Sequence, residues 1–511
     1  NQAILDAFNT GTVLFSFVGH GNPEVWTHES VLNVPSSINA MTNFDRLAYV
    51  TTATCDFSEY DDFNTFSGGE LFLMSPAGGA IGLLGTSREV TSGESLVQYF
   101  YQTLFHQDID KGTSTVGQAM LVGKLDGSGN YPYFYLLGDP AQRLLLPKLY
   151  VTFDSLNGSP LSSTSTPLAA LSQVRIAGSI RDGSSNLTVD QTFNGTVTVT
   201  LYDSPTMVEA ASFFPTDTIR DTYSIEGPIL FRGTATVTNG DFTITFIVPR
   251  DVKLDSGAAK LSGYAYSGSD GRTALGDNKG IQLTGSDSTL AVIDTAGPAL
   301  QVWLGSRSFK SGDDVSMHST AIVDVADLHG LNTSTASIGH SFIAWVDNAV
   351  DSAIDLASTY VSKENDFTKG TSIHAIELPA GHHTLHVRAF NTYDNPTFAS
   401  VDFVAKQGAP YQLYDVIAVP DPIIDHTTFS LVQPGSAGSL VNVTLSLYRT
   451  NGGFVRALTA SSRESAIDIP WDGRDATGTA VADGVYVFIV NVQNVDDGTS
   501  SIATGKCVVT R

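Results

Sequence analysis

The sequence of 511 residues has few cysteines, few basic residues and no long apolar run. Its two cysteines, Cys55 and Cys507, occupy such different contexts that we do not expect a disulfide between them. The sequence has no stretch of eighteen apolar residues, the length at which a membrane-spanning helix is considered. Residues 1–6 carry neither the basic region nor the apolar core of a signal peptide, and a helix is predicted at 3–8. We therefore expect this chain to be the carboxyl-terminal portion of a longer protein.

The shortage of basic residues makes the chain strongly acidic. There are 27 Lys and Arg against 52 Asp and Glu, which gives a formal net charge of −25. A surface of this kind repels phosphate backbones, so nucleic acid is not an expected partner. The simplest role of the charge is to keep the protein soluble.

Length and texture predict a multidomain protein. A chain of 511 residues suggests three or four domains, and an apolar content of 42% is enough for ordinary cores. We place the domains at 1–150, 151–290, 291–408 and 409–511. The first is predicted to be α/β, and the other three are predicted to be all-β sandwiches.

Strands and helices alternate in the first domain. Apolar runs of strand length at 12–18 and 46–54 are rich in Val, Phe and Thr, as buried parallel strands are. Apolar residues recur at helical spacing in 94–106 and 115–125. This alternation predicts a doubly wound α/β layer in which the apolar helix faces cover the sheet.

Two chemically useful side chains follow the two strands. Gly19-His20-Gly21 ends the first strand, and Cys55 ends the second. In open α/β sheets, reactive groups gather at the carboxyl ends of strands, so parallel neighbours would bring His20 and Cys55 together. An imidazole can activate a thiol as a nucleophile, and a sharp turn at the glycines leaves the Gly21 N–H free for an oxyanion. The pattern alone also allows a buried structural cysteine and a histidine bound to a loop carbonyl.

Beyond residue 147 the sequence pattern becomes that of β-strands joined by turns. Segments 174–180, 195–202, 233–237 and 241–248 alternate at period two, with Asp-Gly and Asn-Gly turns at 182–183 and 239–240. These features predict antiparallel β-sandwiches. A domain boundary is expected at 294–298, and a proline-spaced linker at 410–422 precedes the last domain.

Histidines concentrate in the third domain, which raises the question of a metal site. In a strand, His382 and His386 share a face while His383 points to the other, so the three do not converge. Zinc sites need a closer set of ligands, so we predict no metal ligands and expect local packing at turns and edges. The histidines considered are His318, His329, His340, His374, His382, His383 and His386.

Several motifs resemble those of gingipain-type, caspase-like cysteine peptidases. The main ones are Gly19-His20-Gly21 with Trp26 and Glu29, and Thr51-Thr-Ala-Thr-Cys55-Asp-Phe57. Other motifs point more narrowly to the sortases of the type IX secretion system in Bacteroidetes-type bacteria. They are Tyr60-Asp-Asp62, Ser67-Gly-Gly-Glu70, Gly78-Gly-Ala-Ile81, Thr86-Ser-Arg88, Leu136-Leu-Gly-Asp-Pro140, Ile338-Gly-His340 and Gly381-His-His-Thr-Leu385.

The resemblance implies a caspase-like α/β catalytic portion followed by Ig-like β-sandwich domains. It implies His20 as general base, Cys55 as nucleophile, and the backbone amides of Gly21 and Cys55 as the oxyanion hole. His28 and His106 are not assigned this base role. The acidic residue that orients the histidine in this family precedes the strand before the GHG motif, so we expect it before residue 1.

The resemblance requires no cofactor but allows calcium, for which Asp61 and Asp62 are candidate ligands. The last domain looks like the Ig-like domain of the flagellar hook-capping type, often found as a type IX signal. Its Trp471 is expected to cap the core, and Asp472-Gly473 to form a tight turn. Its expected role is docking to secretion partners, and a terminal module without a partner is the alternative.

The implied function is that of a cell-surface cysteine endopeptidase acting as a sortase. It would remove the carboxyl-terminal signal domain of type IX cargo, with outer-membrane components of that system as partners. The protein would be exported to the outer membrane. Water or an amine of anionic lipopolysaccharide can resolve the same acyl-enzyme, so residues do not separate hydrolysis from transpeptidation. A secreted degradative gingipain-like protease and a non-catalytic β-sandwich scaffold remain as alternatives.

Overall fold

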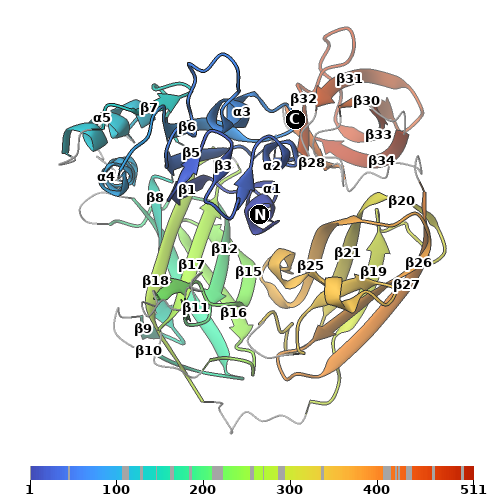
Figure 1. Ribbon diagram of the computed structural model, residues 1–511. Helices are drawn as coiled ribbons and strands as arrows, with labels where there is room; N and C mark the ends of the chain where they lie inside the picture. Colours follow the sequence, from blue (N-terminus) through green and yellow to red (C-terminus); the bar gives the residue numbers. More distant parts are fainter. Residues whose placement is uncertain are drawn as a thin grey trace. The chain divides into compact units, whose positions relative to one another are not determined.

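The chain folds into two compact units, Asn1–Leu146 together with Pro410–Arg511, and Pro147–Ala409 (Figure 1). We describe each by itself. The computed structural model describes residues 2–43, 46–91, 93–105, 114–126, 131–144, 147–161, 166–182, 187–209, 222–253, 258–268, 270–285, 294–334, 339–406, 416–419, 423, 426–432, 440–462, 466–495 and 500–510. His106, Gly183 of the predicted turn and most of the 410–422 linker lie outside these residues.

The first 146 residues are organised around a four-stranded sheet of order β1-β5-β6-β7. β1 (Leu14–Val18), β5 (Ala48–Ala53) and β6 (Ala80–Thr86) are parallel, and β7 (Phe134–Leu137) adds an antiparallel edge. The register of β1 and β5 pairs Leu14 with Tyr49 and Val18 with Ala53. The two strands therefore end at the same level, and their predicted parallel pairing is confirmed.

Helices cover both faces of this sheet. Because successive strand residues point to opposite faces, Tyr49 and Val50 enter different cores. Tyr49 packs in the core that includes α4 (Glu94–Phe105) and α5 (Val116–Asp126). Val50 packs in the core that includes α1 (Gln2–Thr10), α2 (Ser36–Asn39) and α3 (Gly68–Met74). Two covered faces account for the apolar composition of these strands.

A small three-stranded antiparallel sheet lies between β1 and β5 in the chain. It consists of β2 (Gly21–Asn22), β3 (Val25–Trp26) and β4 (Leu32–Asn33). Trp26 is fully buried and stacks on Phe17 of β1, with ring centroids 4.6 Å apart. Its ring also lies 5.2 Å from that of Phe57. This aromatic packing ties the small sheet to the loop that follows β5.

The unit Pro147–Ala409 is almost entirely β. Its strands belong mainly to one large sheet of order β12-β17-β18-β8-β11-β16-β15-β24-β25-β21-β19 and to a five-stranded sheet of order β20-β27-β26-β22-β23. The predicted Asn239-Gly240 hairpin turn is present, with positive φ at both residues. Gly233 of β15 pairs in parallel with Ser362 of β24 and so joins strands from either side of the predicted 294–298 boundary.

The bounds of these strands are as follows. The large sheet contains β8 (Leu149–Leu156), β9 (Ser159–Pro160), β10 (Thr166–Ala169), β11 (Gln173–Asp182), β12 (Gly195–Tyr202), β15 (Ile229–Thr238), β16 (Asp241–Ile247), β17 (Ala258–Tyr266), β18 (Thr273–Thr284), β19 (Ala299–Leu304), β21 (His318–Ala326), β24 (Val361–Lys363) and β25 (Asp366–Glu377). The five-stranded sheet contains β20 (Asp314–Ser316), β22 (Ile343–Val346), β23 (Ile354–Asp355), β26 (Gly381–Phe390) and β27 (Pro396–Lys406), and a separate hairpin contains β13 (Thr206–Glu209) and β14 (Thr222–Ile225). Two 3₁₀ turns occupy Val350–Ser352 and Ala357–Thr359.

The carboxyl-terminal part forms two further sheets around one core. One contains β28 (Ile417–Val419), β29 (Thr427–Val432) and β32 (Ala466–Trp471), and the other contains β30 (Val441–Arg449), β31 (Phe454–Ser462), β33 (Gly484–Asn494) and β34 (Ser500–Val509). Trp471 is buried in the core, and its Nε1 donates to the Arg474 carbonyl at 2.8 Å. Gly473 has φ +67°, as the predicted tight turn needs. Cys507 is fully buried in the same core.

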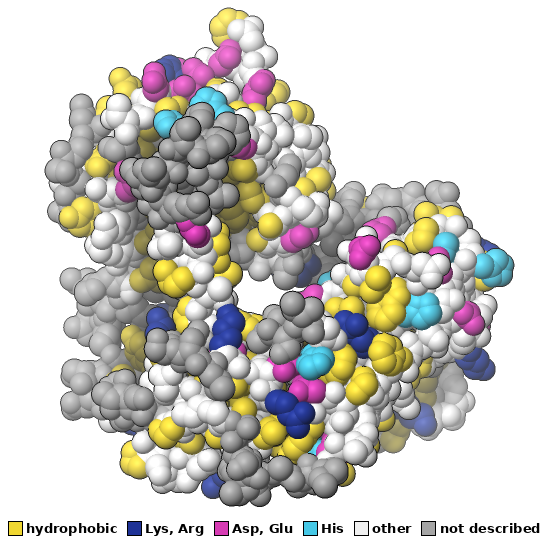
Figure 2. Space-filling view, turned by 60° about the horizontal axis from the view of Figure 1, so that its bottom comes forward, with side chains coloured by type: hydrophobic (Ala, Val, Ile, Leu, Met, Phe, Trp, Pro, Cys, Tyr) yellow, Lys and Arg dark blue, Asp and Glu magenta, His cyan; other side chains and the backbone are white. Residues whose placement is uncertain are grey.

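On the face drawn in Figure 2, acidic side chains are scattered among uncharged and apolar ones. No helix in the described part of the chain has both the length and the apolarity needed to cross a bilayer.

The core between α4 and the sheet can be tested at Phe100, which is fully buried and stacks on Tyr49. Replacing Phe100 by Ala should lower the unfolding free energy of this part by about 3–5 kcal/mol, because it leaves a cavity. Hydrogen exchange of the β5 and β6 amides measures this part alone. Phe105→Ala, on the same helix but 53% exposed, is the control and should change exchange little. Equal effects of the two changes would contradict the packing described.

Candidate active site

Both predicted site residues emerge from the same end of the sheet. His20 lies two residues after β1, and Cys55 lies two residues after β5. The Gly19 N–H donates to the Ala53 carbonyl at 3.2 Å, which ties the histidine-bearing loop to the end of the strand that leads to Cys55. The strand pairing therefore continues into the loops and fixes the two residues relative to each other.

His20, Gly21 and Cys55 line one pocket of about 280 Å³. The structure thus brings together the three residues that the sequence singled out. The remaining wall of the pocket is formed by Asn22, Val25, Thr27, His28, Asp56 and Glu89. The His28 ring centroid lies 6.3 Å from that of His20, so a second imidazole is present at the pocket.

The Cys55 thiol and the His20 imidazole belong to the same pocket. Among the hydrogen bonds of the described residues, none joins these two side chains. The Cys55 thiol instead donates to the carbonyl of Val90, with Sγ and O 3.4 Å apart. Val90 lies in the connection between β6 and α4. Catalytic hydrogen bonds are often long before substrate binds, so the Val90 contact is compatible with a thiol that pairs with an imidazole later.

Two backbone amides are available at the pocket. Thr27 N–H donates to the His20 carbonyl at 2.8 Å, so the Gly21–Trp26 pair is the kind that exchanges no hydrogen bonds. The Gly21 N–H therefore points away from β3. Among the hydrogen bonds of the described residues, none uses the Cys55 N–H. Backbone amides that no other group uses are the kind of donor that an oxyanion hole needs.

Glycine is required at position 21 because the backbone packs closely there. A Cβ on Gly21 would lie 2.5 Å from the Thr54 Oγ1 and 2.8 Å from the Val25 carbonyl oxygen. Neither neighbour is the far end of a flexible side chain. Thr54, which precedes Cys55, and Val25 of β3 thus both limit the space for a side chain at position 21.

The pocket wall is acidic. Asp56 has φ +53° immediately after Cys55, and its pKa is raised, first by burial and then by the carboxylate of Glu89. The guanidinium of Arg88 opposes this rise in the pKa of Asp56. Arg88 Nη1 is itself bound to Asp61 at 2.8 Å and to Glu59 at 3.4 Å. The positive charge of Arg88 is therefore largely neutralised by Asp61 and Glu59, which do not line the pocket.

Asp61 and Asp62, the candidate calcium ligands, make other contacts here. Asp61 pairs with Arg88, and the Asp62 Oδ1 accepts the Asn64 N–H at 2.9 Å. The groups of potential metal ligands that the described residues bring together lie in the unit Pro147–Ala409 instead.

Sequence reasoning missed Asp56 and Glu89 as pocket residues. Both follow parallel strands closely, Asp56 after β5 and Glu89 after β6, so the rule that located His20 and Cys55 also applied to them. Asp56 belongs to the quoted motif Thr51–Phe57, and Glu89 directly follows the motif Thr86-Ser-Arg88. The position of a carboxylate at a strand end was the signal available.

Comparison with known proteins finds one family model that matches the α/β part. Residues 1–145 match the model of peptidase family C25, the gingipain family of cysteine peptidases. The resemblance predicted from the motifs is confirmed by this match. No curated protein matches the chain.

Among solved structures, the chain is similar to dimeric latent PorU from Porphyromonas gingivalis. The two are 25% identical, with a TM-score of 0.36, and the match covers 84% of this chain and 41% of that one. The Arg-specific cysteine proteinase gingipain R is 17% identical, with a TM-score of 0.26 and coverage of 55% and 56%. The chain thus spans about two fifths of the length of the PorU chain, and the family match covers residues 1–145.

Close packing at Gly21 can be tested by thiol reactivity. Gly21→Ala should slow alkylation of Cys55 by iodoacetamide at least several-fold, because the new Cβ displaces Thr54 or the β2–β3 turn. Gly19→Ala is the matched control, since its Cβ would meet only the Phe17 ring, at 3.0 Å. Mass spectrometry of the labelled peptide measures both rates. Unchanged alkylation in Gly21→Ala would show that this packing does not shape the pocket.

Proposed function

We propose that the chain contains the nucleophile, base and oxyanion hole of a cysteine endopeptidase. The observation that supports this most directly is the common pocket of His20, Gly21 and Cys55 at the carboxyl ends of β1 and β5. The match to peptidase family C25 over the same residues agrees with it. The caspase-like character of this α/β part belongs to the same proposal.

In the proposed first step, His20 takes the proton of the Cys55 thiol as the sulfur attacks the scissile carbonyl. The tetrahedral intermediate places its oxyanion against the amides of Gly21 and Cys55. As the peptide C–N bond breaks, His20 returns the proton to the leaving amine, and a thioester with Cys55 remains. An acceptor then attacks the thioester and regenerates the thiol.

The proposed substrate is a secreted protein that carries a carboxyl-terminal signal domain. Cleavage before that domain releases it, which is the reaction of a sortase of the type IX secretion system. This proposal includes export to the outer membrane, docking to type IX components through the carboxyl-terminal β part, and Ig-like β domains. It rests on the motif resemblance and on the family match of residues 1–145.

The acidic wall of the pocket favours an amine as acceptor. Asp56 and Glu89 give the pocket a negative potential, which raises the local concentration of protonated amines. Such an amine can lose its proton at the site before attacking the thioester. Transfer to an amine of anionic lipopolysaccharide is therefore proposed ahead of hydrolysis.

The roles of Cys55 and His20 can be separated from those of nearby residues. Cys55→Ala should abolish cleavage of a cargo protein at its signal domain. His20→Ala should lower the rate by about 10²–10⁴, the usual contribution of a general base. His28→Ala, which removes the other imidazole of the pocket, should lower it less than about tenfold.

The same variants should be labelled with iodoacetamide, because this readout does not depend on the choice of substrate. Cys55 should react rapidly and in a His20-dependent manner, while buried Cys507 stays unlabelled in the native protein. Slow labelling of Cys55, indifferent to His20→Ala, would favour the non-catalytic scaffold instead.

The acceptor can be tested with glycinamide as a small amine. With a cleavable cargo, mass spectrometry should detect the glycinamide adduct of the released product. The double change Asp56→Asn with Glu89→Gln should lower the ratio of aminolysis to hydrolysis several-fold, because it removes the negative charge at the pocket. Products formed only with water would assign the site to hydrolysis, as in a degradative protease.

A further inference from the structure

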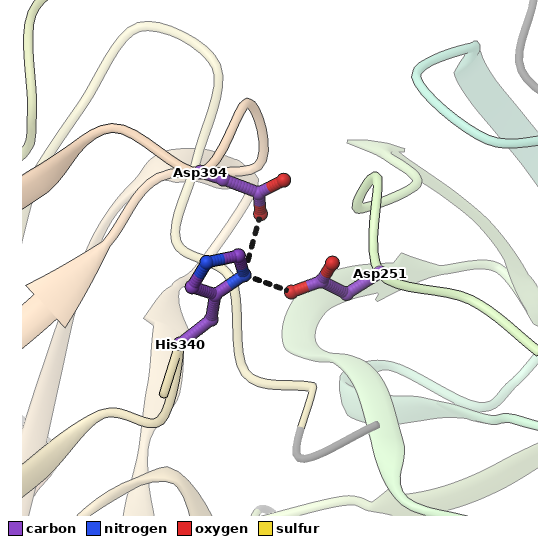
Figure 3. A group of neighbouring side chains, drawn as sticks. All are labelled: Asp251, His340 and Asp394. Atoms are coloured by element: carbon purple, nitrogen blue, oxygen red, sulfur yellow. Dashed lines mark hydrogen bonds and ion pairs between the residues drawn. The ribbon is translucent and has the colours of Figure 1, made fainter. Parts of the chain in front are cut away.

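Three potential metal ligands converge within the unit Pro147–Ala409. Asp251 follows β16, His340 precedes β22, and Asp394 lies in the turn between β26 and β27. His340 Nδ1 lies 2.7 Å from the Asp251 Oδ2 and 3.6 Å from the Asp394 Oδ1, and the three ligand atoms all lie within 4.8 Å of one another. Figure 3 shows the imidazole facing both carboxylates. We propose that these side chains bind a divalent transition-metal ion of the Zn²⁺ class.

The charges at this triad are poorly balanced without an ion. The side chains of Asp251 and Asp394 are only 9% and 11% exposed. The nearby guanidinium of Arg250 lies 3.6 Å from the other oxygen of Asp394 and is half exposed, so it screens that carboxylate weakly. The His340 imidazole can donate its proton to only one of the two carboxylate oxygens, whereas a dication neutralises both carboxylates.

Asn332 holds the two carboxylate oxygens in position. Its Nδ2 donates to the Asp251 Oδ2 and to the Asp394 Oδ1, at 3.1 Å in both cases. The orientation of the amide is fixed because its Oδ1 accepts the Ser334 N–H at 2.9 Å, and Asn332 is fully buried. Each carboxylate oxygen keeps a further lone pair for an ion. Hydrogen bonds of this kind around ligating carboxylates are the usual outer support of a metal site.

The ligand types select the ion. One imidazole nitrogen with two carboxylate oxygens suits Zn²⁺ and related transition metals, whereas Ca²⁺ prefers a larger set of oxygens alone. Three protein ligands leave a fourth tetrahedral position for water. The side chain of His340 is 34% exposed, which gives an ion access from solvent.

An ion here would also join the two β segments of the unit. Asp251 belongs to the segment before residue 285, and His340 and Asp394 belong to the segment after 294. These segments already meet at the Gly233–Ser362 pairing. Because the folded unit binds the ion and the unfolded chain does not assemble the triad, binding should stabilise this junction.

A second group, Asp294, Asp327 and His329, lies wholly in the segment that begins at residue 294. Its bridging amide, Asn391 Nδ2, also donates to the Ala296 carbonyl at 2.9 Å. This group serves as the internal comparison, because its histidine can be removed without touching the first triad.

The test uses the whole chain with Cys55→Ala, which removes the accessible thiol as a competing ligand. After treatment with chelator, Zn²⁺ is titrated in competition with a chromophoric chelator, and the unfolding temperature is recorded with and without Zn²⁺. We expect the chain to bind one equivalent of Zn²⁺. His340→Ala and Asp251→Asn should each weaken the affinity for this Zn²⁺ at least tenfold. His383→Ala is the control. His383 pairs with a single carboxylate, that of Asp347 at 2.6 Å, which is not part of the triad, so its removal should leave the Zn²⁺ binding unchanged.

Co²⁺ provides a readout that does not rely on stability. Its visible absorption should show a site of low coordination number without a thiolate charge-transfer band, and His340→Ala should abolish this spectrum. Zn²⁺ affinity unaffected by His340→Ala would overturn the proposal. The proposal would also be overturned if His329→Ala abolished Zn²⁺ binding while His340→Ala retained it. If Asp251→Asn fails to fold, the His340→Ala titration and the Co²⁺ spectrum still decide between these outcomes.

Discussion

The parallel pairing of β1 with β5 is the constraint on which the pocket depends. It brings two strand ends to the same level, and the hydrogen bond from Gly19 to Ala53 extends this alignment into the loops. The two cores on either side of the sheet fix the strands, so the loops leave from a rigid edge. A shift of one residue in this register would invert which side chains face each core and would move His20 away from Cys55.

Much of the α/β part could be predicted from the sequence because its signals are local. Apolar runs of strand length, helical spacing in 94–106 and 115–125, and glycines around a histidine each reflect interactions within a few residues. The meeting of His20 and Cys55 followed from one topological rule about strand ends. The Val90 contact of the thiol could not be predicted, because it depends on how the connection between β6 and α4 folds back.

In the β region, by contrast, less of the fold could be predicted from the sequence. Its turns could be found from Asn-Gly pairs, but which strands pair across long distances could not, because period-two patterns carry no information about partners. The joining of β15 to β24 is one such pairing. His340 illustrates the same limit. Along the chain it is flanked by Gly339 and Ser341, yet in the folded unit it faces Asp251 and Asp394, which come from two distant segments.

The two thiols of the chain have different chemical fates. Cys55 opens onto the pocket, whereas Cys507 is enclosed in a core with no exposed surface. Peroxide reaching Cys55 would form a sulfenic acid, and the usual rescue is condensation with a second thiol of the same protein. Cys507, sealed in its core, is not available as such a resolving partner while the protein is folded. Oxidation at Cys55 would therefore proceed to irreversible acids unless an external thiol intervenes, so the protein would depend on its surroundings for repair.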